Sequence, residues 1–449
     1  MNRSESRPAR TVATFLAGGL LAVTMAAIPV SEADSAARLV HPGVLRTALA
    51  ARPLDAGVAT DQIAFFEERL AERPGDVLSL RRIASTRLLR FRAYNDLREL
   101  EQAEDAAMRL TAWHEADAGA YATRASVALA RHDFAGAMEA ALRYRSLAPR
   151  GETGATWTLF DALWASGRYE AARGLLEETE TPHPSVGLLS REARLVDGLG
   201  RVSEAAARME RVVRMVDGFA EPPIVRAWAR VELGHFLHHS GSSEAAVARY
   251  VEALDLVPGY PAALEALGWL AYGVDEDLAA AEALFLRSAE YGAHLDLYPL
   301  LAEIAEARGA PARARAYERT FMARIHAPDA ETRMFWRPLA QVLAADTATL
   351  GRALEYAEMD LAQRQDRGAW ATRGWILHRL GRSAEAVEDM ERALAWGSPP
   401  PDILHQAGVV SLESGLRRRG VSLLREALDG RAELGPVVAS EIEDLLAVH

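Results

Sequence analysis

The chain of 449 residues contains no cysteine and no lysine, so that all 51 of its Lys+Arg residues are arginine. Without cysteine there is no disulfide and no thiolate ligand for a metal, and stability must come from packing. Without lysine there is no Schiff-base amine, no phosphate-loop lysine and no catalytic Ser-Lys pair. These absences exclude several classes of enzyme and of nucleotide-binding protein.

An excess of positive charge is also missing, because the formal net charge is -12. Binding to nucleic acid requires clustered positive charge that neutralises phosphates, so no nucleic-acid partner is expected. The basic run Arg417-Arg418-Arg419 is typical of a solvated helix face. No GxxxxGK[ST] loop, HExxH helix or GxSxG elbow occurs. The sequence therefore predicts neither an enzyme nor a cofactor.

Only one stretch of the sequence is long, apolar and uncharged, and it lies between Thr11 and Val30. Arg3, Arg7 and Arg10 precede it, and the small residues of Ser31-Glu32-Ala33 follow it, which is the pattern of a cleaved secretory signal. We therefore predict a signal peptide over residues 1–33, a flexible segment over residues 34–59, and a periplasmic or extracellular protein. The alternative is an uncleaved N-terminal membrane anchor, since about 20 residues can just span a bilayer. No span is expected in the mature chain.

A 34-residue unit that begins at Ala227 carries small residues, large residues and a proline at regular spacing. Its positions 7, 8, 11, 20, 24, 27 and 32 hold Leu233, Gly234, Leu237, Ala246, Tyr250, Ala253 and Pro258. Gly234 and Ala246 are small where two helices would cross closely, and Pro258 would end the second helix. The unit resembles the tetratricopeptide repeat (TPR) at every signature position except position 4, where Arg230 stands.

The same spacing recurs along most of the chain, and constant phase over many copies is typical of a solenoid. Units begin at Pro261, Arg367 and Pro401, others end at Pro149 and Pro184, one covers about 186–219, and weaker copies cover about 77–117, 295–328 and 333–366. The resemblance implies an all-α fold, a right-handed α-solenoid of antiparallel helix pairs. We expect an N-terminal array over 60–219 and a C-terminal array over 220–449, with a hinge near Pro222 and Pro223.

In the TPR frame, positions 2, 5, 9 and 12 of the first helix of each pair face the concave side. Aromatic and histidine side chains occupy several of these positions, although the packing positions already hold the usual Leu, Gly and Ala. Since aromatic residues dominate binding energetics, we predict a ligand or partner groove. The alternative is that they pack sideways between neighbouring helices. The residues are Trp157, Trp164, Trp228, His235, His238, Trp269, Tyr272, Trp375 and His378.

A histidine pair and an acidic run are two further clusters in the sequence. His235 and His239 are spaced i, i+4 on a predicted helix and could both reach one metal ion, but no carboxylate follows in the zincin manner, so no metal site is predicted. The acidic run Asp275-Glu276-Asp277 is interpreted as a solvated turn. TPR proteins that clamp chaperone tails use lysine and asparagine at concave positions, whereas this chain has no lysine and its asparagines are Asn2 and Asn95.

The function that this resemblance implies is that of an exported TPR scaffold. It would bind a protein or peptide in its concave groove, in envelope assembly or secretion. The alternative is a solenoid that binds a small molecule or glycan, because tryptophan faces can stack on sugar rings.

Overall fold

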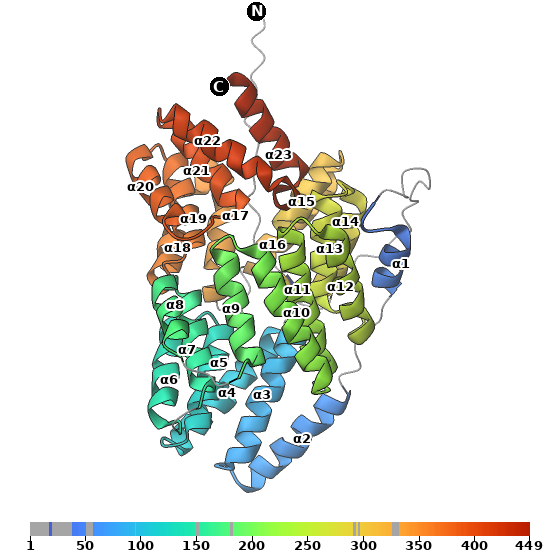
Figure 1. Ribbon diagram of the computed structural model, residues 1–449, viewed down its shortest axis with the longest axis vertical. Helices are drawn as coiled ribbons and strands as arrows, with labels where there is room; N and C mark the ends of the chain where they lie inside the picture. The colour runs from blue at the N-terminus through green and yellow to red at the C-terminus, as the bar shows by residue number, and fades with distance from the viewer. Residues whose placement is uncertain are drawn as a thin grey trace, which may run out of the picture.

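The computed structural model describes residues 18–19, 38–50, 57–94, 96–149, 152–179, 183–290, 293–294, 297–325 and 332–449. The protein is all-α, as predicted (Figure 1). Within these ranges the strands are two residues long, β1 (Gly18–Gly19) and β2 (Ala293–His294), and they pair antiparallel. Apart from β1, the predicted signal segment lies outside the described residues. No helix of the described part has the length and apolar character that crossing a membrane requires.

Ten antiparallel helix pairs follow one another in the described part of the chain, and together they form the predicted TPR-like solenoid. Helix α2 (Gly57–Glu72) comes directly before them in the chain. The pairs are α3 (Val77–Tyr94) with α4 (Leu97–Trp113), α5 (Ala118–Ala130) with α6 (Phe134–Leu147), α7 (Gly154–Ala165) with α8 (Tyr169–Glu177), α9 (Val186–Gly198) with α10 (Val202–Gly218), α11 (Pro223–His239) with α12 (Ser243–Leu256), α13 (Pro261–Gly273) with α14 (Leu278–Glu290), α15 (Leu297–Ala307) with α16 (Pro311–Ile325), α17 (Trp336–Leu343) with α18 (Leu350–Gln363), α19 (Arg367–Arg379) with α20 (Ser383–Leu394), and α21 (Pro401–Glu413) with α22 (Arg417–Asp429). Two short 3₁₀ turns, η2 (Thr332–Phe335) and η3 (Thr347–Thr349), flank α17.

Local sequence sets the ends of these helices. Asp117 and Asp366 are N-caps whose carboxylates accept the backbone amides of Ala120 and Ala369. Pro261 begins α13 at a position where the missing amide costs nothing. Gly241, in the turn between α11 and α12, has φ of 80°, a conformation that other residues rarely adopt. Each pair therefore has a defined length and a tight turn, which fixes the pitch of the stack.

The solenoid turns far enough to close on itself. The Gln365 amide donates to the Ser166 carbonyl at 3.1 Å, and the Ser398 amide donates to the Gly198 carbonyl at 2.8 Å. These bonds join residues about 200 positions apart, and they bring α18 and α19 beside α8, as Figure 1 shows. The closed superhelix turns its concave side into the interior of the molecule, which the repeat pattern alone did not predict.

A last helix, α23 (Arg431–Val448), leaves the stack and packs against α13. It is kinked at Gly435, where φ is 77°, and a Cβ at that position would overlap the Tyr272 ring. Since only glycine combines this conformation with the close approach, Gly435 allows α23 to lie on α13. The helix thereby covers part of the concave side.

Part of the segment predicted to be flexible packs on the solenoid instead. Helix α1 (Pro42–Ala50) lies on α12 and α14 (Figure 1), and Val40 and Ala48 are buried. The Asp275 carboxylate accepts the backbone amides of Leu39 and Val40, both at 2.8 Å. The acidic run around Asp275 is therefore a docking point for this segment and not a solvated turn, because Asp275 accepts the amides of the chain that leads into α1 and Asp277 pairs with Arg38.

The predicted division at 219/220 falls in the turn between α10 and α11. One hydrophobic cluster extends across it, from Val212 and Val216 on α10 to Ala229 and Leu233 on α11. Packing is therefore continuous at this point, and the proposed hinge stays a prediction.

Candidate functional site

The concave side of the superhelix encloses a cavity of about 900 Å³. Side chains from α7, α9, α11, α13, α19, α21 and α23 line it, so residues far apart in the sequence meet there. This volume lies in the range of pockets that hold small ligands, about 300–1,000 Å³. The cavity is therefore the candidate functional site.

The structure places five of the nine predicted groove residues on the cavity lining, namely Trp164, His235, His238, Trp269 and Trp375. Position 9 of the repeat frame is the most consistent, because all three of the residues assigned to it line the cavity. These are His235 on α11, Trp269 on α13 and Trp375 on α19. Position 9 lies near the middle of the inner helix, where the closed superhelix is hollow.

The other four predicted groove residues do not line the cavity, which corrects their assignment. Trp157 is only 7% exposed and packs sideways, with Gly187 against its indole and Arg191 over its ring. Tyr272 is 1% exposed because α23 covers it, and its hydroxyl donates to Glu303 at 2.5 Å.

Trp228 packs against the cluster between α9, α10 and α11. His378 is paired with Glu413, at 3.5 Å from Nε2 to the carboxylate. The alternative explanation, that the rings pack sideways between neighbouring helices, therefore accounts for these residues.

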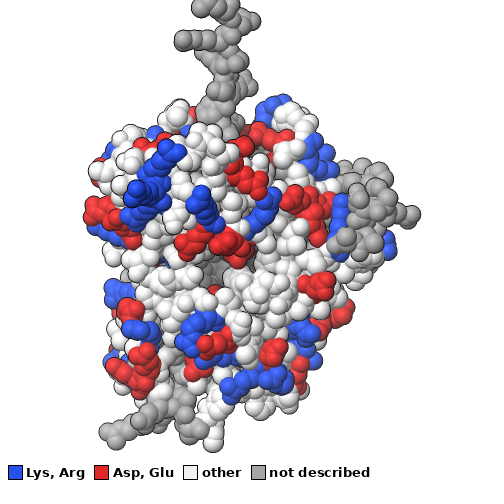
Figure 2. Space-filling view, turned by 45° about the horizontal axis from the view of Figure 1, so that its top comes forward, with Lys and Arg blue, Asp and Glu red and all other residues white. Residues whose placement is uncertain are grey.

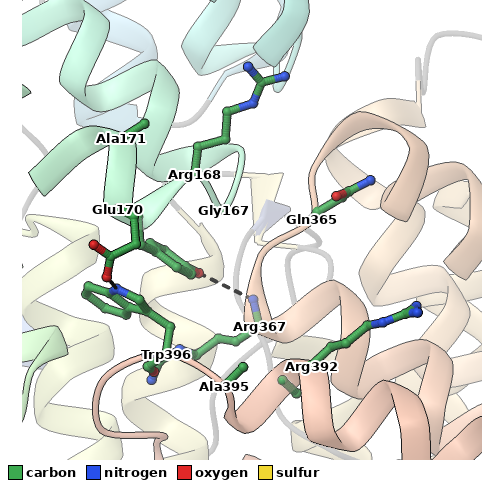
Figure 3. Close-up of a pocket in the computed structure, with 11 residues that line it drawn as sticks. Gly167, Arg168, Glu170, Ala171, Gln365, Arg367, Arg392, Ala395 and Trp396 are labelled. Atoms are coloured by element: carbon green, nitrogen blue, oxygen red, sulfur yellow. Dashed lines mark hydrogen bonds between the residues drawn. The ribbon is translucent and has the colours of Figure 1, made fainter. Parts of the chain in front are cut away.

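A second group of aromatic side chains lies where the superhelix closes. Trp396, in the loop after α20, stacks on Tyr169 with ring centroids 4.5 Å apart and meets Trp164 edge-on at 5.4 Å. Its indole nitrogen donates to Glu170 at 2.9 Å, and the Arg367 amide donates to the Tyr169 hydroxyl at 3.3 Å (Figure 3). We call Trp164, Tyr169, Arg367 and Trp396 the closure cluster. All four residues line the cavity, and Tyr169, Arg367 and Trp396 also line a smaller pocket of about 280 Å³.

Acidic groups outnumber basic groups on the cavity lining. Six carboxylates face two arginines there: Asp197, Glu232, Glu265, Asp402, Glu426 and Glu433 against Arg194 and Arg367. The surface in Figure 2 shows acidic side chains bordering a hollow near its centre. Both arginines already have partners, because Arg367 donates to the carbonyl of Trp396 at 2.7 Å and Arg194 lies 3.6 Å from the Asp161 carboxylate.

Burial shifts the pKa values of several of these groups. Desolvation raises the pKa of Glu265 to about 7, although a hydrogen bond from Trp269 opposes the shift, and it raises the pKa of Asp402 to about 6. Desolvation also lowers the pKa of His238 and of His405 to about 4, so both rings are neutral at pH 7. The cavity thus shields charge from water while its surface carries an excess of acidic groups.

His235 and His239 differ in their surroundings. The His235 side chain is exposed to the cavity, yet protein surrounds it closely enough that desolvation lowers its pKa. Burial also opposes the charged form of His239, but Asp197 at 3.4 Å and Glu433 at 3.9 Å raise its pKa. Within the described ranges, no group of three or more His, Asp or Glu side chains is arranged to hold a metal ion.

One serine lies beside a histidine, since the Ser243 hydroxyl is 2.9 Å from His238 Nδ1. A hydrolytic triad would need a carboxylate on the other ring nitrogen. Among the described residues none is bonded to His238 Nε2, and Ser243 is not on the cavity lining. The pair therefore does not form a catalytic arrangement.

We expect the free energy of unfolding to respond to pH through Glu265. Burial raises the pKa of Glu265 from its ordinary value of 4.5 to about 7 in the folded state, so the stability that its protonation provides is fully present below pH 4.5 and is lost as the pH rises through 7. Glu265→Gln should therefore gain about 2 kcal/mol relative to the original protein between pH 5 and pH 8. Urea unfolding at both pH values measures this difference. Glu210→Gln, on the exposed face of α10, is the control, and an equal gain there would contradict the assignment.

Sequence analysis missed several residues on the cavity lining. Glu265, Asp402 and His405 occupy positions 5, 2 and 5 of their repeats, which are concave positions in the frame. Applying the frame to polar as well as aromatic residues would have found them. Trp396 lies outside the helices, so no helical frame could have placed it.

The comparisons with known proteins concern the repeat and the fold. The family model described as "Tetratricopeptide repeat" matches residues 368–396, which cover nearly all of α19 and α20. No curated protein matches the chain. This segment coincides with the unit that the sequence placed at Arg367.

Three solved structures are similar to this chain over much of its length. They are yeast Tom70 (11% identity, TM-score 0.33, covering 86% of this chain and 92% of that chain), a tetratricopeptide repeat protein from Parabacteroides merdae (15%, 0.31, 58% and 97%), and the APC/C hetero-tetramer Cut9-Hcn1 (12%, 0.34, 90% and 95%). Because these TM-scores are low, the path of the superhelix is argued from its own contacts. Residues 368–396 match the tetratricopeptide repeat, and the chain as a whole is a solenoid of TPR-like helix pairs.

Proposed function

We propose that this protein is an exported, non-catalytic TPR scaffold that binds a segment of a partner protein in its central cavity, in envelope assembly or secretion. The observation that carries the proposal is the cavity of about 900 Å³ into which inner helices of distant repeats present His235, Trp269 and Trp375. Tryptophan side chains in a partly enclosed pocket are typical anchors of protein interfaces. The TPR-like fold is typical of protein–protein interaction.

A second candidate is the binding of a small molecule or glycan. The enclosure of the cavity favours it, because a volume of this size suits a small ligand and Trp269 and Trp375 offer ring faces for stacking. The two candidates differ in what the native protein carries: a stoichiometric protein partner or a small ligand.

Replacing Trp375 or Trp269 by alanine should weaken partner binding by about 1–4 kcal/mol. Both side chains are only partly buried, so the melting midpoint should fall less than for a core tryptophan. The measurement is capture of the partner from the envelope fraction by the full chain, followed by the dissociation constant of each variant.

Trp113→Ala is the matched control, because Trp113 is 60% exposed and does not line the cavity. Equal loss of the captured partner from all three variants would point to a surface other than the cavity. Loss of stability with unchanged affinity per folded molecule would make Trp269 and Trp375 core residues and would reject the proposal.

Export is part of the proposal and has its own check. The native protein should begin near Asp34 and be found outside the cytoplasm, because Ser31-Glu32-Ala33 fits a cleavage site. N-terminal sequencing of the native protein decides this point. An intact Met1 on soluble cytoplasmic material would contradict export without bearing on the cavity.

A further inference from the structure

Three side chains on one face of α21 line the cavity, and each has a buried polar atom that lacks a hydrogen-bond partner among the described residues. Asp402, His405 and Gln406 are spaced i, i+3 and i+4, so they share one helix face. Asp402 Oδ2, His405 Nε2 and Gln406 Oε1 are buried and have no hydrogen-bond partner within the described ranges. His405 is 3% exposed and Gln406 is 6% exposed.

Buried polar atoms without a partner cost free energy because they lose their hydrogen bonds to water, so such a cluster is typical of a site that a ligand completes. A carboxylate oxygen and an amide oxygen are hydrogen-bond acceptors, and a neutral imidazole nitrogen can be one. The group that satisfies this face of α21 must therefore donate hydrogen bonds.

The charges around this face favour a cationic hydrogen-bond donor over a neutral one. Six carboxylates line the cavity, and the two arginines that line it are held by other groups of the protein. His239 is the one histidine of the lining whose pKa is raised, and Asp197 and Glu433 accompany it. An anionic ligand would thus meet repulsion without an available guanidinium, whereas a cationic ligand would meet complementary charge.

Aromatic faces add to this preference. Trp375 lies next to α21, with its ring centroid 6.5 Å from that of His405. The closure cluster already shows how this surface holds a guanidinium, because Arg367 lies over Trp396 at 5.6 Å and over Tyr169 at 5.8 Å. A cation over an indole face is attracted by the ring quadrupole, and the attraction is stronger when water is excluded.

We infer that the cavity binds a cationic side chain, guanidinium or ammonium, which a segment of the partner protein inserts between Trp375 and the acceptors Asp402 and Gln406. The inference rests on the proposed function, because it takes the cavity as the partner site. It adds the chemistry of recognition, since the partner segment must present an arginine or lysine.

The test uses the full chain and three acetylated, amidated peptides that differ at one residue. The peptides are Gly-Ala-Arg-Ala-Gly and its counterparts with glutamine and with glutamate in the central place. Quenching of tryptophan fluorescence and isothermal titration measure their affinities. The arginine peptide should bind about tenfold more tightly than the glutamine peptide, and the glutamate peptide should bind most weakly.

Asp402→Asn removes one charge with little change of shape and should lower the affinity for the arginine peptide about tenfold while leaving the glutamine peptide unaffected. Trp375→Ala should weaken both peptides, and Trp113→Ala neither. Unfolding midpoints verify that each variant is folded. If Asp402→Asn does not fold, Gln406→Leu replaces it as the variant that removes an acceptor.

The outcomes separate the two claims. Equal or tighter binding of the glutamine or glutamate peptide would overturn the cationic inference, as would failure of the arginine peptide to bind. If capture of the partner protein still depends on Trp375 in either case, the proposed function stands, but the partner is not recognised through a cationic side chain. If neither the partner nor any peptide responds to Trp375→Ala, the proposed function falls as well.

Discussion

Replacing Arg337 by methionine should lower the free energy of unfolding by about 3–5 kcal/mol, the loss expected when one member of a buried ion pair is removed. The Arg337 guanidinium donates to Asp360 at 2.9 Å and to Asp366 at 2.6 Å. The Asp360 side chain is only 4% exposed, so it would remain charged and buried with Arg364 as its one partner. Urea unfolding of the full chain measures the loss.

The same replacement should also loosen the closure of the superhelix. Arg337 holds Asp366, which caps α19 and directly follows Gln365, the residue whose amide bonds to Ser166. Hydrogen exchange at Gln365 should therefore accelerate in Arg337→Met. Arg382→Met is the control, because Arg382 pairs with Glu385 on the exposed surface, where water screens the pair and its loss should change stability little. Similar losses in both variants would mean that Arg337 has no special place in the closure.

Gly234→Leu should destabilise the protein by about 1–3 kcal/mol or more through overpacking. A Cβ at Gly234 would overlap the ring of Tyr250, which is 1% exposed and packed in the core of the pair. Gly374→Leu should cost less, because the nearest atoms to a Cβ there are farther away: Asp389 Cβ lies at 3.1 Å, and the Ala386 carbonyl oxygen and Met390 Cε lie at 3.3 Å.

Gly174 on α8 is the matched control, because no atom lies within 4 Å of a Cβ built there. Gly174→Leu should leave the unfolding midpoint unchanged or raise it, since glycine is a poor helix former. If Gly234→Leu behaves like Gly174→Leu, the close crossing of α11 and α12 is not present in solution.

The repeat frame predicted those features of the fold that depend on neighbours in sequence. It placed Gly234 where the two helices of one pair cross, and the structure has the Tyr250 ring there. It placed Trp269 and Trp375 on the concave side because position 9 depends only on the twist of one helix. Both features depend only on residues within one 34-residue unit, so the sequence of that unit was enough to predict them.

The frame did not predict features that depend on the sum of many small rotations. Closure is one, because the angle between successive pairs must add up to a full turn before Gln365 meets Ser166. The burial of Tyr272 is another, because it results from α23 leaving the stack at the Gly435 kink. No residue near Tyr272 in the sequence carries a signal for either event.

The hydrogen bonds that close the superhelix also bear on how the protein unfolds. In an open repeat array each unit contacts only its neighbours, so the ends fray and partly folded arrays are populated. Here Ser166 and Gly198 are tied to Gln365 and Ser398, and α23 is tied to α13, so the loss of one array exposes surface of the other. The chain should behave as a single cooperative unit, with calorimetric and van't Hoff enthalpies closer together than in a linear array.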